Sequence, residues 1–176
     1  MQPSTFTIIS CGARKEVHVT RASLLYTGPL FVKQLEYART IAPDSHIRIL
    51  SAKHGLMRLH RLFAPYDQRF TGRHVNIEWA ETVQHQWRQW RQVRSCVNDL
   101  PITLLAGDLY AHHLSAALTP ILGEAPQFIR PLQHMGLGYQ LQWLIKQTRR
   151  EVAFPSLESL VDLDYSGAPF AGASYA

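Results

Sequence analysis

The chain has 176 residues, of which 46% are hydrophobic and 18% are charged, so we expect one globular domain and not a disordered chain. No apolar run approaches the roughly 18 residues of a membrane span, and the N-terminus lacks the basic region of a secretory signal. The two cysteines, Cys11 and Cys96, are too few for a disulfide framework, which predicts a cytoplasmic protein.

Charge divides the chain into two parts. The formal net charge is +5, but all 18 Lys and Arg precede residue 151, and four of the 13 carboxylates lie from residue 151 onward. Residues 1–150 therefore carry a balance of +9. A basic body indicates a polyanionic partner such as nucleic acid; ordinary solvated surface charge is the alternative. We expect a single α/β catalytic domain over residues 1–150 and an acidic, small-residue tail over residues 151–176 that lies outside the core.

Short apolar runs alternate with helical periodicity along the chain. The predicted strands cover residues 6–10, 47–52, 102–106 and 127–131. The predicted helices cover residues 30–41, 76–97, 108–118 and 137–149. We expect Asn76 and Asp108 to cap the second and third helices, and Pro120 to close the third. This alternation predicts a three-layer α/β/α fold with a four-stranded parallel sheet.

Polar side chains follow each predicted strand. Because the carboxyl ends of parallel strands meet at one edge of a sheet, we expect these four loops to gather there into a site. In chain order the loops carry Cys11, Gly12, Arg14 and Lys15; then Lys53, His54, Tyr66 and Asp67; then Asp108 and Tyr110; and finally His134.

The Lys53-His54-Gly55 step is the strongest local signal. His54 can protonate or hydrogen-bond a leaving group, and Lys53 can bind phosphate; a histidine that caps a turn is the alternative. Asp67 and Asp108 are candidate catalytic carboxylates. Their alternatives are local hydrogen bonding in a turn for Asp67 and helix capping for Asp108.

The loop after the first strand offers an anion site. Gly12 permits a tight turn whose backbone amides bind an anion, with Arg14 and Lys15 adding charge; the alternative is a plain strand–loop junction. Cys11 is either a nucleophile or an inert packing thiol. Tyr26 either stacks on a base or belongs to the core.

The tryptophan-rich helix over residues 76–97 has two faces. Its apolar stripe is expected to pack on the sheet, while Arg88 and Arg91 on the other face either contact phosphates or remain solvated. His112 and His113 are adjacent on a helix and cannot both face one ion. We therefore expect no metal and no cofactor.

Four motifs resemble one family of small bacterial and phage proteins. They are a Ser-Cys-Gly-x-x-Lys start at residues 10–15, Leu-Tyr-Thr-Gly at 25–28, Ser-Ala-Lys-His-Gly-Leu at 51–56 and Pro-Tyr-Asp at 65–67. The resemblance covers roughly residues 6–146, with departures at Ala13-Arg14 and Arg58-Leu59-His60 that leave substrate choice open. The family is distantly similar to the uracil-DNA glycosylase fold, and some relatives resemble antiphage DNA glycosylases.

The resemblance implies excision of a modified base from DNA by hydrolysis of its N-glycosidic bond, in antiphage defence, with neither a cofactor nor an obligate protein partner. A carboxylate must stabilise the oxocarbenium-like sugar, and the candidates are Asp67 and Asp108. The leaving base needs a proton or a hydrogen-bond donor, and the candidates are His54 and His134. Aromatic side chains hold the flipped base; the candidates are Tyr26, Phe63, Tyr66 and Tyr110. Cationic side chains bind the phosphates of the DNA backbone; the candidates are Arg14, Lys15, Lys53, Arg73, Arg88 and Arg91.

Three alternatives stay open at this point. If Lys53 or Lys15 attacked the sugar, strand cleavage would follow base release. An enzyme acting on free nucleosides or nucleotides, by base exchange or hydrolysis, would bind DNA weakly. A DNA-binding module without catalysis would keep tight, salt-dependent binding when Asp67 and Asp108 are replaced.

Overall fold

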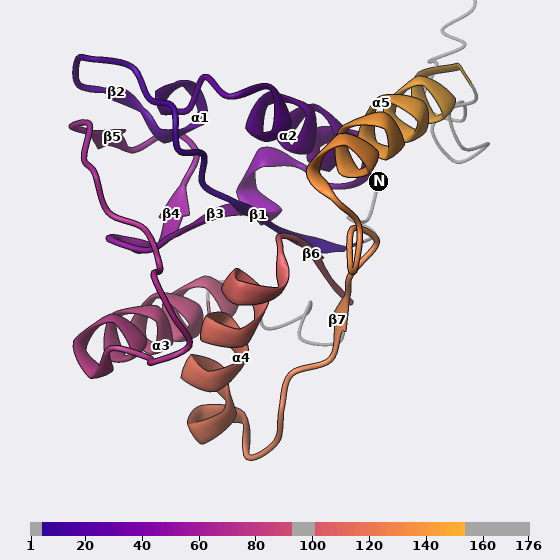
Figure 1. The fold of residues 1–176 in the computed structure, drawn as a ribbon. Coiled ribbons are helices and arrows are strands. Elements are labelled where there is room, and N and C mark those ends of the chain that lie inside the picture. The colour runs from indigo at the N-terminus through magenta and orange to yellow at the C-terminus, as the bar shows by residue number, and fades with distance from the viewer. Residues whose placement is uncertain (1–4, 93–100, 154–176) are drawn as a thin grey trace, which may run out of the picture.

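The computed structural model of the chain describes residues 5–92 and 101–153, with the backbone alone for residues 91–92 and 151–153. Its centre is a five-stranded sheet in the order β4-β3-β1-β6-β7 (Figure 1). These strands are β1 (Phe6–Ser10), β3 (Ile47–Ser51), β4 (Gly55–Arg58), β6 (Ile102–Leu105) and β7 (Phe128–Ile129). A separate ribbon pairs β2 (Thr20–Arg21) with β5 (Leu62–Phe63) in antiparallel fashion. The fold is therefore mixed α/β.

Four of the five strands run parallel, and they lie where strands were predicted. β1 pairs with β3 and with β6, and β6 pairs with β7, each in parallel register. All of β3 and nearly all of β1 is buried, as a parallel strand covered on both faces requires. The carboxyl ends of these strands consequently meet at one edge of the sheet.

The fifth strand, β4, corrects the prediction of a four-stranded, wholly parallel sheet. Residues 52–54 turn the chain back, and Gly55 follows with a φ of +67°, a left-handed conformation that glycine adopts without steric cost. β4 then pairs antiparallel with β3, with Ser51 opposite Gly55 and Arg48 opposite Arg58. Four residues are too short a run for hydrophobic alternation to distinguish a strand from a loop.

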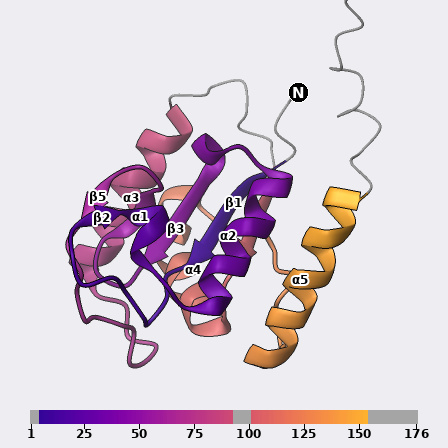
Figure 2. The same cartoon turned by 90° about the horizontal axis from the view of Figure 1, so that it is seen from above.

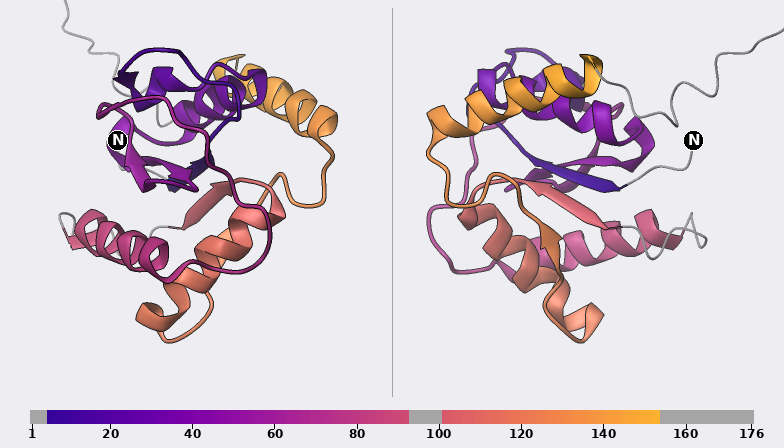
Figure 3. Two further views of the ribbon diagram at one scale, coloured as in Figure 1. Left: turned by 60° about the vertical axis from the view of Figure 1, so that its left-hand side comes forward. Right: turned by 90° about the vertical axis from the view of Figure 1, so that its right-hand side faces the viewer.

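Helices cover both faces of the sheet, as the predicted three-layer arrangement requires. The helices on one face are α1 (Ala22–Leu25), α2 (Pro29–Ile41) and α5 (Leu137–Ala153). Those on the other face are α3 (Ile77–Gln92) and α4 (Asp108–Leu122) (Figure 3). A single 3₁₀ turn, Asp44–His46, leads from α2 into β3. Viewed from above, α5 lies beside α2 (Figure 2).

Each face of the sheet has its own hydrophobic core, because successive residues of a strand point to opposite sides. On β1, Ile9 packs with the residues of α2 and α5, and Ile8 packs with those of α3 and α4. The tryptophans of α3 (Trp79, Trp87 and Trp90) are buried in the second core. The predicted packing stripe of this helix is thus confirmed.

Helix termini agree with the sequence at one point and differ at two. Asn76 caps α3 as predicted, because its Oδ1 accepts a first-turn backbone N–H at 2.9 Å. Asp108 is not the cap of α4 but its first residue; Gly107 occupies the cap and supplies no side-chain bond. Pro120 lies inside α4, which ends only where Gly123 turns left-handed at φ +81°. A proline in the last turn forfeits one hydrogen bond, whereas the left-handed residue stops the helix.

Parts of the prediction lie outside the described residues. One part is the end of the helix predicted over residues 76–97, namely residues 93–97 with Cys96. The other is the tail from residue 154 onward. α5 reaches Ala153, three residues past the predicted domain boundary. Among the described residues, no helix combines the length and the apolar character needed to cross a bilayer.

Candidate active site at the carboxyl edge of the sheet

Ser51, the last residue of β3, is the centre of the polar groups at this edge. Its side chain is fully buried, and its Oγ accepts the backbone N–H groups of Lys53 and His54, each at 3.0 Å. These two bonds hold the turn that leads into β4. With both lone pairs engaged, the Ser51 hydroxyl is left to donate, and the Tyr66 hydroxyl oxygen lies 2.6 Å away as its acceptor.

The Tyr66 hydroxyl continues this hydrogen-bond chain. Its oxygen lies 2.6 Å from that of Tyr26, and the Tyr26 hydroxyl donates to Met57 Sδ at 3.4 Å. The donors therefore run in one direction, from Ser51 through Tyr66 and Tyr26 to Met57. Because every hydroxyl in the chain has a partner, the Tyr66 ring is held in one position.

Three tyrosine hydroxyls gather here in their protonated form. Burial raises the pKa of Tyr66 to about 12, because desolvation disfavours the phenolate. Burial likewise raises the pKa of Tyr26 and that of Tyr110. The Tyr110 hydroxyl lies 3.2 Å from Sγ of Cys11, the first residue after β1. The segments after β1 and β5 and the first turn of α4 thus meet through neutral phenols.

Two lysines flank the Tyr66 ring. Lys15 Nζ lies 4.6 Å from the ring centroid and Lys53 Nζ lies 5.4 Å from it. Lys15 comes from the loop after β1, and Lys53 comes from the turn after β3. Neither ammonium group forms an ion pair with a described carboxylate. An anionic group that approaches Tyr66 would therefore meet two uncompensated positive charges.

His54 lies against the same ring. Its imidazole packs edge-on to Tyr66 at 4.9 Å and against Phe63 at 4.8 Å. Burial and the neighbouring charge of Lys53 lower its pKa, so the ring is neutral at physiological pH and has one N–H to donate. Its backbone carbonyl accepts from Gln86, but its ring nitrogens bond to no described residue. The structure therefore does not support the turn-capping alternative for this imidazole.

The two candidate carboxylates differ in their surroundings. Asp67 directly follows Tyr66, is exposed, and has no ion pair or side-chain hydrogen bond with any described residue. Asp108, at the start of α4, accepts a hydrogen bond from Arg130 and lies 3.9 Å from His134 Nδ1. Asp108 is thus engaged with the loop after β7, whereas Asp67 is available to a ligand.

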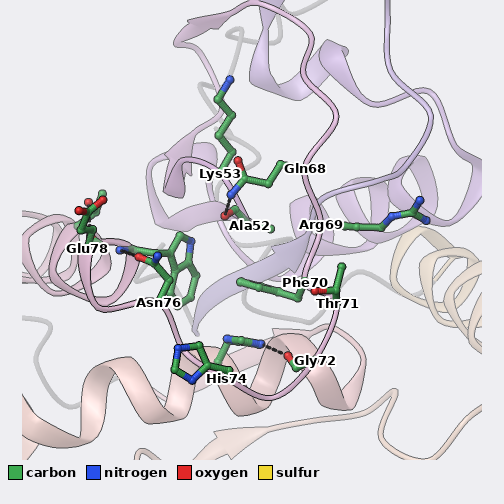
Figure 4. A pocket seen from close by; sticks show the side chains of 13 residues that line it. Ala52, Lys53, Gln68, Arg69, Phe70, Thr71, Gly72, His74, Asn76 and Glu78 are labelled. Carbon is green, nitrogen blue, oxygen red and sulfur yellow. Dashed lines mark hydrogen bonds between the residues drawn. The ribbon is translucent and has the colours of Figure 1, made fainter.

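A cleft of about 470 Å³ opens beside these residues (Figure 4). We call it the Phe70 cleft, after an aromatic ring that lines it. Its walls also carry Trp79, the amides of Gln68 and Asn76, and Lys53. Lys53 Nζ also lies 5.4 Å from the Tyr66 ring centroid, so the cleft and the Tyr66 site share this residue. Its volume lies within the roughly 300–1,000 Å³ of small-molecule sites.

The loop that carries Phe70 is held at both ends of the cleft. The His113 ring stacks on Phe70 with centroids 3.8 Å apart, and its Nε2 lies 2.7 Å from the Gly72 carbonyl oxygen. At the other end, Gln68 Nε2 donates to the Ala52 carbonyl at 3.1 Å. The stacking surface of the cleft is therefore positioned before any ligand arrives.

The adjacent histidines of α4 serve this loop. His112 Nε2 lies 2.9 Å from the Arg73 carbonyl oxygen. His113 Nε2 lies 2.7 Å from the Gly72 carbonyl oxygen. A carbonyl only accepts, so both rings carry their proton on Nε2. Within the described residues, no group of three His, Cys, Asp or Glu side chains is arranged to hold a metal ion.

The structure brings the predicted site residues together in two contact groups. The group around Tyr66 comprises Cys11, Lys15, Tyr26, Lys53, His54, Tyr66 and Tyr110. The second group comprises Asp108, Arg130 and His134 at the ends of β6 and β7. His134 is mostly exposed and adopts a positive φ of 59°.

Tyr26 and Gly12 have a packing role that the sequence left open. Only 2% of Tyr26 is exposed, and its ring contacts Phe31 at 4.8 Å, so it cannot stack on a base. A Cβ at Gly12 would lie 3.4 Å from Tyr26 Cβ and 3.5 Å from Phe31 Cβ. The core interpretation therefore holds for Tyr26, whose hydroxyl orients Tyr66.

The arginines predicted to contact nucleic acid come from separate elements. Arg14 follows β1, Arg73 precedes α3 and Arg88 lies on α3, and all three are exposed. None of them lines the Phe70 cleft. The side chain of Arg91 lies outside the described residues.

Sequence reasoning missed three residues that organise the site. Ser51 was visible as a hydroxyl residue at the end of an apolar run, two residues before Lys53, and this position was its signal. Phe70 and Gln86 carried no local signal, because their partners His113 and Leu56 are distant in the sequence.

The chain belongs to a family of unknown function, DUF6884, whose model matches residues 6–146. The match includes the four motifs and every candidate site residue described above. No curated protein matches the chain.

Proposed function

We propose that this protein is a cytoplasmic DNA glycosylase with a uracil-DNA-glycosylase-like fold that excises a modified base, as in phage DNA. The observation that carries the proposal is the Tyr66 site. There, a ring fixed by Ser51 lies within 5.4 Å of both Lys15 Nζ and Lys53 Nζ, edge-on to the neutral His54. The four motifs resemble a family of which some relatives resemble antiphage DNA glycosylases, and this resemblance supports the same conclusion.

The Phe70 cleft accepts the base in this proposal. An enzyme that acts on a base must take it out of the stack and hold it between aromatic or apolar groups. The partly exposed Phe70 supplies such a surface, and Gln68 and Asn76 supply amides for the polar edge of the base. Because Lys53 adjoins both the cleft and Tyr66, the glycosidic bond would lie beside the Tyr66 site.

Asp67 is the carboxylate best suited to the hydrolysis. Water adds its oxygen to C1′ as the C1′–N bond breaks; the bonding electrons leave with the base, and Asp67 takes the proton from water. Lys53 and the His54 N–H stabilise the departing base, which is then protonated from solvent. Asp108 is already bonded to Arg130, so we assign it to positioning the loop after β7.

The volume of the Phe70 cleft favours a second candidate, an enzyme acting on free nucleosides or nucleotides. A space of about 470 Å³ is enough for a nucleotide without a polymer. This candidate predicts base release or exchange from mononucleotides at rates equal to those from DNA, with little dependence on salt.

Mass spectrometry of released bases tests the proposal. The protein is incubated with unmodified DNA, with uracil-containing DNA and with phage DNA that bears modified cytosines. We expect a free base from one of these substrates, lost in Asp67→Asn and retained in Glu36→Gln, an equivalent change on the exposed face of α2. Absence of base release from every DNA, together with release from mononucleotides, would replace the proposal with the second candidate.

A further inference from the structure

A second cleft, of about 600 Å³, lies between the outer strand β4 and helix α3. We call it the edge cleft. Its walls carry six basic or titratable nitrogen side chains, namely Arg48, Lys53, His54, Arg58, His60 and Arg61. None of the residues that line it is Asp or Glu. A cleft with charge of one sign concentrates the field that attracts a polyanion.

Three cations of the edge cleft, Lys53, Arg58 and Arg61, have no ion-pair partner among the described residues. Arg58 and Arg61 are also exposed. By contrast, Arg39 and Arg130 are each bonded to an aspartate. Protein surfaces normally intersperse both signs, so like charges gathered in one cleft indicate an anionic partner.

A neighbouring hollow of about 330 Å³ extends this surface along β4. It shares Arg48, Arg58 and His60 with the edge cleft. The one carboxylate that lines it, Asp44, is bonded to Arg39. The positive surface is therefore elongated, as an extended chain of phosphates requires.

The edge of β4 is closed to a peptide strand. The Gln86 side chain accepts the Leu56 N–H at 2.6 Å and donates to the His54 carbonyl at 2.9 Å. Gln86 thus occupies backbone groups that an added strand would use. A Cβ at Gly55 would lie 2.4 Å from Gln86 Oε1, so the glycine is needed for this contact. The partner must therefore contact side chains and not the strand edge.

Aromatic rings lie beside the cations of the edge cleft. The Arg48 guanidinium lies 4.4 Å from the Trp90 ring centroid and donates to the carbonyls of Ser45 and Ile47, which fixes its charge in place. Phe63 packs on His54. The buried Trp90 ring thus holds the Arg48 charge at the wall of the cleft, where it adds to the attraction for a phosphate.

The edge cleft also joins the Tyr66 site. Lys53 and His54 line the cleft, and the same two residues contact the Tyr66 ring. We infer that the edge cleft binds the sugar–phosphate backbone of the nucleic acid strand whose base enters the Phe70 cleft, an inference that rests on the proposed function for the identity of that base. The substrate is then a polymer, held on one side of the reacting nucleotide by Arg58 and Arg61.

Charge reversal tests this inference. Arg58→Glu/Arg61→Glu is compared with Lys146→Glu/Arg149→Glu, a pair of exposed residues on α5 that changes the net charge equally. The readout is fluorescence anisotropy of a labelled single-stranded oligonucleotide over a range of salt concentrations. We expect the edge-cleft variant to bind at least about tenfold more weakly and to lose about 1.4 from the slope of log Kd against log salt, or 0.7 per phosphate contact.

The α5 control is expected to bind within about twofold of the wild type, since its charges lie far from any phosphate contact. Equal losses in the two variants, or no loss in either, would overturn the inference. Binding of anionic phosphatidylserine vesicles in preference to the oligonucleotide would also overturn it, in favour of a membrane surface. Thermal unfolding of each variant verifies that the reversed charges leave the fold intact.

Base release separates this inference from the proposed function. If no variant releases a base but the edge-cleft variant alone loses binding, the glycosylase proposal fails and the edge cleft remains a nucleic acid site. If the wild type releases a base and the edge-cleft variant binds and reacts as the wild type does, the inference fails and the glycosylase proposal stands.

Discussion

The Tyr66 site and the edge cleft share Lys53 and His54 but are built in opposite ways. Around Tyr66, buried hydroxyls have partners from Ser51 onward. In the edge cleft, Arg58 and Arg61 are exposed and unpaired among the described residues. Fixed groups suit bond breaking, because position determines rate; uncompensated charges suit capture of a polyanion. The contrast assigns chemistry to one region and binding to the other.

Ser51→Ala should produce the largest loss of stability, because it removes the hydroxyl that fixes the Tyr66 site. It leaves the buried N–H groups of Lys53 and His54 and the Tyr66 hydroxyl without their partner, which should lower the free energy of unfolding by about 3 kcal/mol. Urea unfolding measures the change. The control Ser23→Ala removes a hydroxyl with no side-chain bond to a described residue and should cost less than about 0.5 kcal/mol; equal losses would contradict the role of Ser51.

Gly55→Ala should lower the free energy of unfolding by about 2 kcal/mol, because it strains the turn that joins the Tyr66 site to the edge cleft. The residue has φ +67°, which disfavours any Cβ, and the added Cβ would displace Gln86 from the edge of β4. The matched change Gly28→Ala has φ −68° and no atom within 4 Å of the new Cβ, so stability should stay within about 0.5 kcal/mol. Similar unfolding midpoints for both variants would show that the turn is not strained.

Neutralising the edge cleft should slightly stabilise the free protein. Arg58→Gln/Arg61→Gln removes repulsion between like charges, so we expect a gain of about 0.5 kcal/mol at low salt that disappears at high salt. Chemical denaturation at two ionic strengths provides the measurement. A loss of stability at low salt would mean that these arginines have stabilising partners, which would remove the argument for an external anion.

The smallest effect concerns the titration of His54. Its pKa is lowered below 6.5 in the folded state, so the unfolded chain binds the proton more strongly. Stability is then greatest above pH 6.5 and falls as pH drops from 6.5 to the folded-state pKa. His54→Gln should flatten this part of the profile of unfolding free energy against pH relative to the wild type. A profile identical to that of the wild type would contradict the lowered pKa of His54.

The sequence predicted the four parallel strands and the edge at which their loops meet, because both follow from local patterns. Apolar runs marked the strands, and polar residues after each run marked the edge. It could not predict β4, since a four-residue strand after a tight turn has no periodicity of its own. The end of α4 was misplaced at Pro120 because a proline in the last turn of a helix is tolerated.

The candidate site was predictable only in its chain positions. The sequence identified Lys53, His54 and Tyr66, but not the hydrogen bond that joins Tyr66 to Ser51. It offered both Asp67 and Asp108 as candidate catalytic carboxylates, and it could not foresee the bond from the distant Arg130 that engages Asp108. The edge cleft was not foreseen, since its cations become neighbours only when β4 folds back on β3.

The most direct test of the account is single-turnover base release measured as a function of protein concentration. We predict that Asp67→Asn lowers the maximal rate at least about 100-fold and leaves the half-saturating concentration unchanged. Arg58→Glu/Arg61→Glu should raise the half-saturating concentration about tenfold and leave the maximal rate unchanged. The division between a reacting site and a binding cleft would be contradicted if both variants altered the same parameter, or if neither differed from the wild type.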